Sequence, residues 1–330
     1  MKLTLEPELF INANRHDLMK ILYNALDNYA YLDFDIDNPD IRSWVQANNI
    51  DDWQLAHDSL IMDAASYNIT NSVIVRAELT TSDWTQEVPI ISLGDAKKIM
   101  TQQVSIWVEN ARNDGDFFRL FISPESRKLI EYLEGLGRLK FDTIGGIGEM
   151  RKEITQSPTR LGYRNKQFVV YDSDASEPNK LQRDAIAIKG TCDQHKIKHH
   201  YWRRRAIENY LPVPYLLEKI HPSNLGSSDA KKYRAFCSMT DAQRHHFHMK
   251  RGINDTTCYS SPLYQERETE RILSTGNLYD GFSSSFANKF ISQINSKEAF
   301  VIRRFMIMDD KMDELKQLEK SLIHYIRVPI

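Results

Sequence analysis

The stretch Phe168–Asp174, Phe-Val-Val-Tyr-Asp-Ser-Asp, decides the fold class. Its first four residues, Phe168–Tyr171, are aromatic or β-branched, which is typical of a strand buried on both faces of a parallel sheet. Two carboxylates, Asp172 and Asp174, follow where such a strand ends. The carboxyl ends of parallel strands face the binding crevice of an open α/β sheet, so both acids can turn toward one divalent cation. Taken alone, an Asp-x-Asp pair more often caps a turn or the next helix.

Two further strand patterns support the cation interpretation. Val104–Glu109 is another apolar run that ends in an acid, and the polar turn Asn110–Asp116 follows it. Leu139–Ile144 is a third strand candidate, ended by the glycine-rich turn Gly145–Gly148. Strands that alternate with helical patterns predict right-handed βαβ crossovers and a mostly parallel sheet. That arrangement would bring Glu109 to the same sheet edge as the Asp-x-Asp pair.

An acid after a first strand and an Asp-x-Asp after a third resemble the pattern of TOPRIM domains, which occur in topoisomerases, primases and the overcoming-lysogenization-defect (OLD) nucleases. The segment Trp202–Leu211 contains Glu208-Asn-Tyr, which is similar to an element that follows the Asp-x-Asp in OLD-like proteins. A vaguer likeness lies at His248–Gly252. The resemblance covers roughly residues 104–211 and implies a Rossmann-like α/β core.

The resemblance also implies roles for individual residues, with two departures from the family pattern. Asn110 stands where the family usually has a glycine after the first acid. The next aspartate of the family pattern is displaced by one place, so either Asp114 or Asp116 corresponds to it. Carried over, the catalytic residues are Glu109, Asp172 and Asp174. These three residues and Asp114 would bind one or two Mg²⁺ or Mn²⁺ ions. Glu208 would lie next to these ligands and support them.

A basic segment between residues 189 and 205 indicates contact with nucleic acid. Cations that lie beside aromatic side chains can hold phosphates while bases stack. Alternatively, one or two of the arginines pair with core carboxylates such as Glu208 or the metal-site acids. Cys192, His195 and His199 have a spacing that could suggest zinc, but no fourth ligand is evident. The candidate nucleic-acid-binding residues are Lys198, Arg203, Arg204, Arg205 and, further along the chain, Lys250.

Composition sets outer limits on the protein class. The 330 residues carry a formal net charge of −2, so the overall charge does not indicate a nucleic-acid-binding protein. No apolar run approaches the roughly 18 residues that span a bilayer. The N-terminus has acids where a signal peptide needs an apolar segment, and the three cysteines are widely spaced, so we expect a cytoplasmic protein.

The regions outside the core are expected to be helical. Residues 1–102 predict a mostly helical accessory region with one strand at Ser72–Leu79, followed by a TOPRIM-like core over 103–215. Residues 216–330 predict a helical C-terminal region. Its last helix, Asp309–Ile326, carries an apolar stripe that indicates core packing or, less simply, a dimer or partner seam.

The function that the resemblance implies is metal-dependent endonuclease activity on DNA or RNA, tRNA included, as the effector of a bacterial anti-phage system of the OLD or PARIS type. No Walker A motif occurs in the sequence, so a coupled ATPase or sensor would be a separate chain, and homo-oligomers are a further option. The rival hypothesis is a binding or scaffold subunit with a degenerate TOPRIM-like core. The missing glycine and shifted aspartate motivate it, while the retained Asp172 and Asp174 argue against it.

Overall fold

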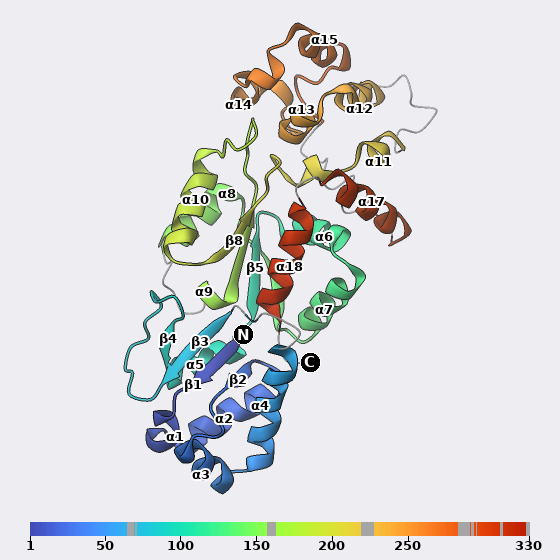
Figure 1. Ribbon diagram of the computed structural model, residues 1–330. Coiled ribbons are helices and arrows are strands. Elements are labelled where there is room, and N and C mark those ends of the chain that lie inside the picture. The colour runs from blue at the N-terminus through green and yellow to red at the C-terminus, as the bar shows by residue number, and fades with distance from the viewer. Residues whose placement is uncertain are drawn as a thin grey trace.

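The computed structural model describes residues 1–64, 69, 71–156, 163–218, 228–282, 291, 294, 296–310 and 313–327. Over these residues the chain forms two four-stranded sheets whose strands all pair in parallel, with helices packed around them (Figure 1). The α/β class expected from the alternation of strands and helices is therefore confirmed. None of the described helices is both long and apolar enough to span a membrane.

The first hundred residues build the N-terminal sheet, whose strand order is β2-β1-β3-β4. Its strands are β1 (Lys2–Leu5), β2 (Tyr31–Asp33), β3 (Ser72–Arg76) and β4 (Ile90–Ser92). The helices of this unit are α1 (Glu8–Asn12), α2 (Arg15–Leu26), α3 (Pro39–Ala47), α4 (Ile50–Ala64) and α5 (Leu93–Thr101).

Residues 1–102 were expected to contain one strand among helices, whereas the structure has four strands that form this sheet. The sequence pattern indicated only β3, because β1, β2 and β4 have three or four residues each. Runs that short show no periodicity that separates a strand from the flank of a helix. The helix starts were easier to predict. Asn38 accepts hydrogen bonds from the backbone of Asp40 and Ile41 at the start of α3, and Ser92 caps α5.

The core sheet has the strand order β6-β5-β7-β8. Its strands are β5 (Val104–Val108), β6 (Leu139–Thr143), β7 (Gln167–Tyr171) and β8 (Lys198–Tyr201). The chain leaves β5 toward β6 on one side, then crosses back to β7 and continues to β8 on the other. The boundary between β5 and β7 is therefore a topological switch point. The helices of this unit are α6 (Ala111–Phe121), α7 (Pro124–Gly135), α8 (Ile147–Gln156), α9 (Tyr163–Lys166) and α10 (Arg183–Gln194).

Both faces of the core sheet are covered, as the continuous apolar strands predicted. Ile106 and Val170 belong to the large core that contains α6, α7 and much of the C-terminal region. Trp107 and Val169, which alternate with them, pack in a second core with α8 and α10. Successive side chains of a strand point to opposite faces, so one short run fills two cores.

Strand β8 was not expected from the sequence, which indicated only a basic segment at these residues. Lys198–Tyr201 pairs in register with Phe168–Tyr171 and forms one edge of the sheet. The sequence Lys-His-His-Tyr lacks the apolar alternation of a strand, which is why the pattern did not indicate it. Polar and charged residues are common on edge strands, where they discourage pairing with other chains.

The C-terminal region is helical, as expected, but its last helix returns to the core sheet (Figure 1). The ring of Tyr325 in this helix lies 5.5 Å from that of Phe168 in β7. The predicted helix 309–326 begins later, at Glu314, and Met312 lies outside the described residues. The elements are η1 (Ile207–Tyr210), α11 (Val213–Glu218), α12 (Ser228–Ser238), α13 (Asp241–His246), η3 (Gly252–Asn254), α14 (Thr256–Tyr259), η4 (Pro262–Tyr264), α15 (Arg267–Gly276), α17 (Ser296–Asp309) and α18 (Glu314–Ile326).

Buried polar contacts join the N-terminal unit to the core. The side-chain amide of Asn71 donates to the carbonyl of Asn165 at 2.9 Å, and the amide of Asn165 donates back to the Asn71 side chain at 2.7 Å. The guanidinium of Arg138 lies 4.1 Å from the ring centre of Tyr29.

Candidate functional site

Glu109 and Asp172 directly follow the two central strands of the core sheet and lie next to each other. Because β5 and β7 are parallel neighbours, the residues that follow them emerge at the same edge, at the switch point. The backbone N–H of Asp172 donates a hydrogen bond to Oε1 of Glu109 at 3.2 Å. The strand order thus brings together the two acids that the sequence analysis placed at strand ends.

The start of α6 fixes a third carboxylate at this edge. Asn110 is the N-cap residue, and its side-chain oxygen accepts hydrogen bonds from the backbone N–H groups of Arg112 and Asn113, both at 3.1 Å. In return, Oδ2 of Asp114 accepts the backbone N–H of Asn110 at 2.9 Å. This reciprocal capping holds Asp114 in the first helical turn, where its charge acts on Glu109. Of the two candidates left open by the sequence, Asp114 is therefore the one at the site.

The turn after β7 orients the fourth carboxylate. The buried Ser173 hydroxyl donates to the carbonyl of Arg204 at 2.9 Å. Asp174 has a φ of 50°, in the left-handed region that aspartate tolerates better than most residues, and its N–H donates to the carbonyl of Arg205 at 3.1 Å. These bonds tie the Asp-x-Asp turn to the segment that leads into Glu208.

Glu208 and Lys250 form an ion pair beside the carboxylate cluster. Glu208 lies in η1 and its side chain is buried. Nζ of Lys250 lies 3.3 Å from Oε1 of Glu208, and the lysine side chain remains partly exposed. The charges of Glu208, Asp172 and Glu109 raise the pKa of Lys250 above its usual range, so the ammonium stays charged at neutral pH.

Burial is the main cause that raises the pKa of each of the four acids, and the charges of neighbouring carboxylates, including those of Glu208 and Asp255, add to it. Burial, and next the charge of Asp174, raise the pKa of Glu109 to about 7. Burial raises the pKa of Asp114 to about 7, although the hydrogen bond from the Asn110 backbone acts to lower it. Burial and the Glu109 charge raise the pKa of Asp172 well above its usual range. The pKa of Asp174 is raised by burial, although Arg205 and Lys250 oppose the rise.

The donor chemistry of this cluster suits a hard divalent cation, since all its acceptors are carboxylate oxygens. In the described part of the chain, however, no three His, Cys, Asp or Glu side chains are arranged so that they could hold a metal ion. That finding covers Glu109, Asp172 and Asp174, and it covers the Cys192, His195 and His199 triplet considered for zinc. Ion binding at the sheet edge would therefore require side-chain rotations.

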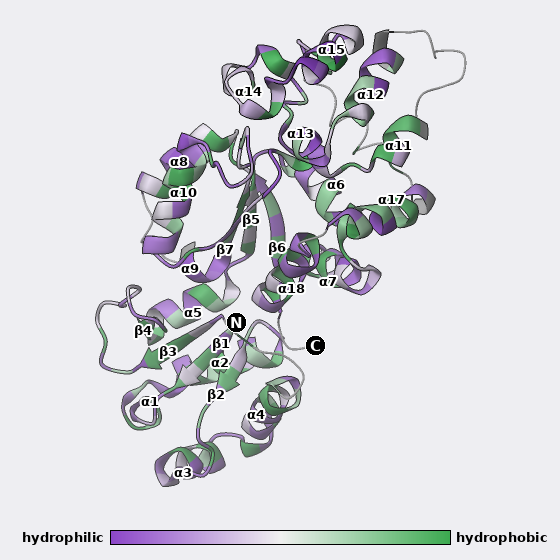
Figure 2. Ribbon diagram, turned by 45° about the horizontal axis from the view of Figure 1, so that its top comes forward, coloured by the Kyte–Doolittle hydropathy of each residue, from purple (hydrophilic) through white to green (hydrophobic). Residues whose placement is uncertain are grey.

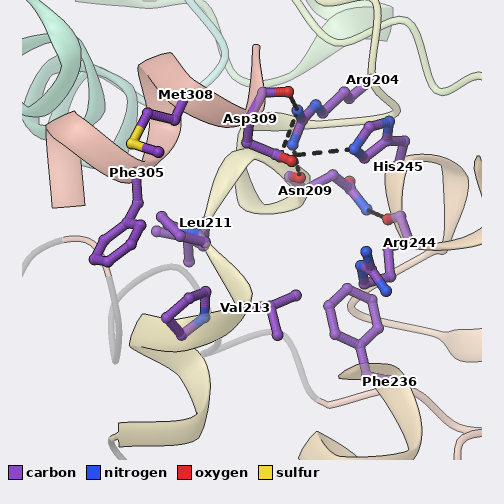
Figure 3. A pocket seen from close by; sticks show the side chains of 12 residues that line it. Arg204, Asn209, Leu211, Val213, Phe236, Arg244, His245, Phe305, Met308 and Asp309 are labelled. Carbon is purple, nitrogen blue, oxygen red and sulfur yellow. Dashed lines mark hydrogen bonds and ion pairs between the residues drawn. The ribbon is translucent and has the colours of Figure 1, made fainter. Parts of the chain in front are cut away.

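Arg204 is buried in the structure, which corrects its expected role as an exposed phosphate ligand. Its guanidinium donates to Asp309 Oδ2 at 2.7 Å and to the carbonyl of Asn209 at 2.9 Å (Figure 3). It also lies over the ring of Tyr210, 4.5 Å from the ring centre. Asp309 also faces His245 at 3.8 Å. The arginine thus holds α17 against η1.

Arg205 is also buried and likewise serves the structure of the site. Its guanidinium lies 3.3 Å from Asp255 and donates to the Thr257 hydroxyl at 3.1 Å and to the sulfur of Cys258 at 3.0 Å. The alternative that arginines of this run pair with carboxylates is therefore confirmed. Their partners are Asp309 and Asp255, and neither was named from the sequence.

The remaining predicted phosphate ligands lie in different places. Lys198 is the first residue of β8, so it lies at the amino-terminal end of the parallel strands, whereas the carboxylates lie at the carboxyl-terminal end. It lines a pocket of about 490 Å³ with Arg164 and Lys196. That position corrects the expectation that Lys198 borders the carboxylate site. Arg203 is exposed on the turn after β8. Of the five cations, only Lys250 lies within the cluster and is also partly exposed.

Glu314 is a site-supporting residue that sequence reasoning missed. Its buried carboxylate accepts hydrogen bonds from the Tyr210 hydroxyl, from His200 Nε2 at 3.0 Å and from the backbone N–H of Arg203 at 2.8 Å. These bonds outweigh burial and lower the pKa of Glu314. No local signal marked this residue, because it lies about a hundred positions from the motif it supports.

Comparisons with models of protein families, with curated proteins and with solved structures found no match. We therefore infer the function from the geometry of the site and from the sequence pattern.

Proposed function

We propose that this protein is a TOPRIM-type, divalent-metal-dependent endonuclease. The observation that supports the proposal is the placement of Glu109 and Asp172 directly after two neighbouring parallel strands at the switch point, where the charges of Asp174 and Asp114 also act on Glu109. The repulsion between neighbouring carboxylates at neutral pH is relieved when they bind either protons or a cation. Mg²⁺ or Mn²⁺ matches their oxygen-only chemistry.

In this proposal the carboxylates bind the ion after side-chain rotation, with Glu208 beside them. A bound ion would acidify a water molecule and neutralise charge on a phosphodiester. Glu109, whose pKa is about 7, can also take up or release a proton at its carboxylate near neutral pH. The ammonium of Lys250 lies at the partly exposed rim of the cluster and would contact a phosphate oxygen of DNA or RNA.

The remaining parts of the proposal rest on the sequence and its resemblance alone. They are a role as effector in anti-phage defence, cytoplasmic location, and control by a separate ATPase or sensor chain. The protein alone is then expected to cleave poorly until its partner releases it.

One observation favours a second candidate function, a catalytically degenerate binding or scaffold subunit. The described side chains form no ready metal-ligand group, and the Lys250 ammonium already lies beside Glu208, where it neutralises part of the negative charge. In such a protein the lysine would take the place of the ion.

One experiment separates the two candidates. Full-length protein is incubated with plasmid, single-stranded DNA and tRNA in Mg²⁺ or Mn²⁺, beside Asp172→Ala and the control Asp116→Asn, which alters an acid on α6 outside the cluster. Thermal unfolding is measured with and without Mn²⁺. A nuclease is stabilised by Mn²⁺ even where it cleaves poorly without its partner, and whatever cleavage it shows is abolished by Asp172→Ala and retained by Asp116→Asn. The absence of both cleavage and Mn²⁺ stabilisation would establish the degenerate subunit.

A further inference from the structure

Helix α17 carries apolar side chains on two opposite faces. The inner face, with Ile302 and Met306, packs in the large core. Figure 2 shows that α17 contains hydrophobic as well as hydrophilic residues. A patch of exposed large apolar side chains on one side of a helix is typical of a surface that contacts another protein. The outer face exposes four large apolar side chains: Phe300 (71% exposed), Val301 (49%), Phe305 (37%) and Met308 (68%).

The outer residues of α17 form a continuous surface with one positive charge in it. Val301, Phe305 and Met308 have i, i+4, i+7 spacing and therefore form one stripe, and exposed Arg304 lies beside it. Phe305 and Met308 also line a pocket of about 270 Å³ that continues inward from the stripe (Figure 3). We call the exposed residues Phe300, Val301, Arg304, Phe305 and Met308 the α17 face.

Helix α4, in the N-terminal unit, has a second exposed apolar face with the opposite charge. Its inner side packs through Trp53 and Leu60, whereas Leu55 is 61% exposed and Met62 is 74% exposed. Helix α4 contains four aspartates and no lysine or arginine. The outer side of α4 includes the exposed residues Asp51, Leu55, Ile61 and Met62 and the half-buried Asp58, and we call these five residues the α4 face.

The two faces match each other in shape and charge. Leu55 and Met62 are seven residues apart on α4, as Val301 and Met308 are on α17, so each helix presents a stripe of two turns. Acidic side chains border the first stripe and Arg304 borders the second. The two helices lie in opposite halves of one molecule (Figure 1), so the contact needs a second copy.

We propose that the α4 face of one copy packs on the α17 face of a second copy. Such a contact joins two different surfaces, and it closes into a pair with two equivalent contacts or continues into a longer chain of copies. It buries a small number of large apolar side chains with a charged border, which is typical of micromolar association between proteins. The inference does not depend on the carboxylate site.

The test uses full-length protein in two surface variants, Leu55→Lys/Met62→Lys and Val301→Asp/Met308→Asp. Mass is measured by sedimentation or light scattering over about two decades around micromolar concentration. Wild-type mass is expected to rise with concentration, and each variant alone is expected to stay monomeric. An equimolar mixture of the two variants recovers association, because one supplies an intact α17 face and the other an intact α4 face.

Two controls keep the outcome decisive. Ile186→Asp changes an exposed apolar residue on α10 and is expected to associate like wild type. The milder variants Arg304→Glu and Asp51→Lys are expected to associate weakly alone and to recover when mixed. A monomeric wild type at all concentrations overturns the proposal. Association that persists in either double variant, or a mixture of folded variants that stays monomeric, also overturns it, since these results indicate another surface or pairing between like faces.

Discussion

Replacing Glu109 with glutamine tests whether the carboxylates are held together against their own repulsion. Glutamine keeps the size of the side chain and the oxygen that accepts the Asp172 N–H, and it removes the charge. In the absence of metal we expect Glu109→Gln to be more stable than wild type at pH 8. This result is unusual for a substitution at a half-buried polar position, where most changes destabilise.

The magnitude follows from the pKa of Glu109, which is raised from 4.5 to about 7. A carboxyl whose pKa is higher in the folded state opposes folding once it ionises. The penalty is absent below pH 4.5, grows between pH 4.5 and 7, and is complete above pH 7. The shift corresponds to at most about 3 kcal/mol at about 1.4 kcal/mol per pKa unit. Partial solvent exposure and repulsion shared with Asp174 reduce the expected gain to about 1–2 kcal/mol at pH 8.

The assay is urea and thermal unfolding of wild type and Glu109→Gln at pH 5 and pH 8 in chelator, repeated with Mn²⁺. The variant is expected to unfold a few degrees higher at pH 8, at about 2–4 °C per kcal/mol, and nearly with wild type at pH 5. Mn²⁺ is expected to stabilise wild type more than the variant. Asp116→Asn serves as the control. A variant that is less stable than wild type at pH 8, or a difference independent of pH, would refute the reasoning.

Three further predictions follow from the contacts of the site. Arg205→Met is expected to lower the free energy of unfolding by about 3–5 kcal/mol in urea titrations, because it leaves the Asp255 carboxylate without its buried guanidinium; a loss below 1 kcal/mol would contradict this role. Glu314→Gln is expected to cost about 1–3 kcal/mol at pH 7. Because the pKa of Glu314 is lowered in the folded state, that cost should disappear as the pH falls through the lowered pKa, and a pH-independent cost would count against it. Lys250→Gln should weaken nucleic-acid binding and reduce the salt slope by about one, whereas Lys198→Gln should change neither; equal effects in filter binding would contradict the assignment of the two sheet edges.

The sequence by itself determined the central part of the core sheet and the order of its acids. The apolar runs of β5 and β7 are buried on both faces, so their composition alone indicates parallel strands. Glu109 and Asp172 follow those strands directly, and their meeting at one edge is a consequence of parallel pairing. The expected polar turn Asn110–Asp116 is wrong, because α6 already begins at Ala111, where the Asn110 side chain caps it through local hydrogen bonds.

The sequence did not determine the N-terminal sheet or the edge strand β8. Apart from β3, these strands have only three or four residues, and Lys198–Tyr201 is polar, so no periodic pattern identified them. Their partners are supplied by segments elsewhere in the chain, such as the pairing of β8 with β7.

Tertiary structure alone decided which charged residues face the carboxylate site. Arg203, Arg204 and Arg205 are consecutive in the sequence and equally basic. Two of them are buried because Asp309 and Asp255, at distances of 105 and 50 residues, lie within reach of their guanidinium groups. A charge is tolerated inside a protein only where a partner compensates its desolvation. Local sequence cannot show where a distant partner will lie, because that position is set by the packing of the whole chain.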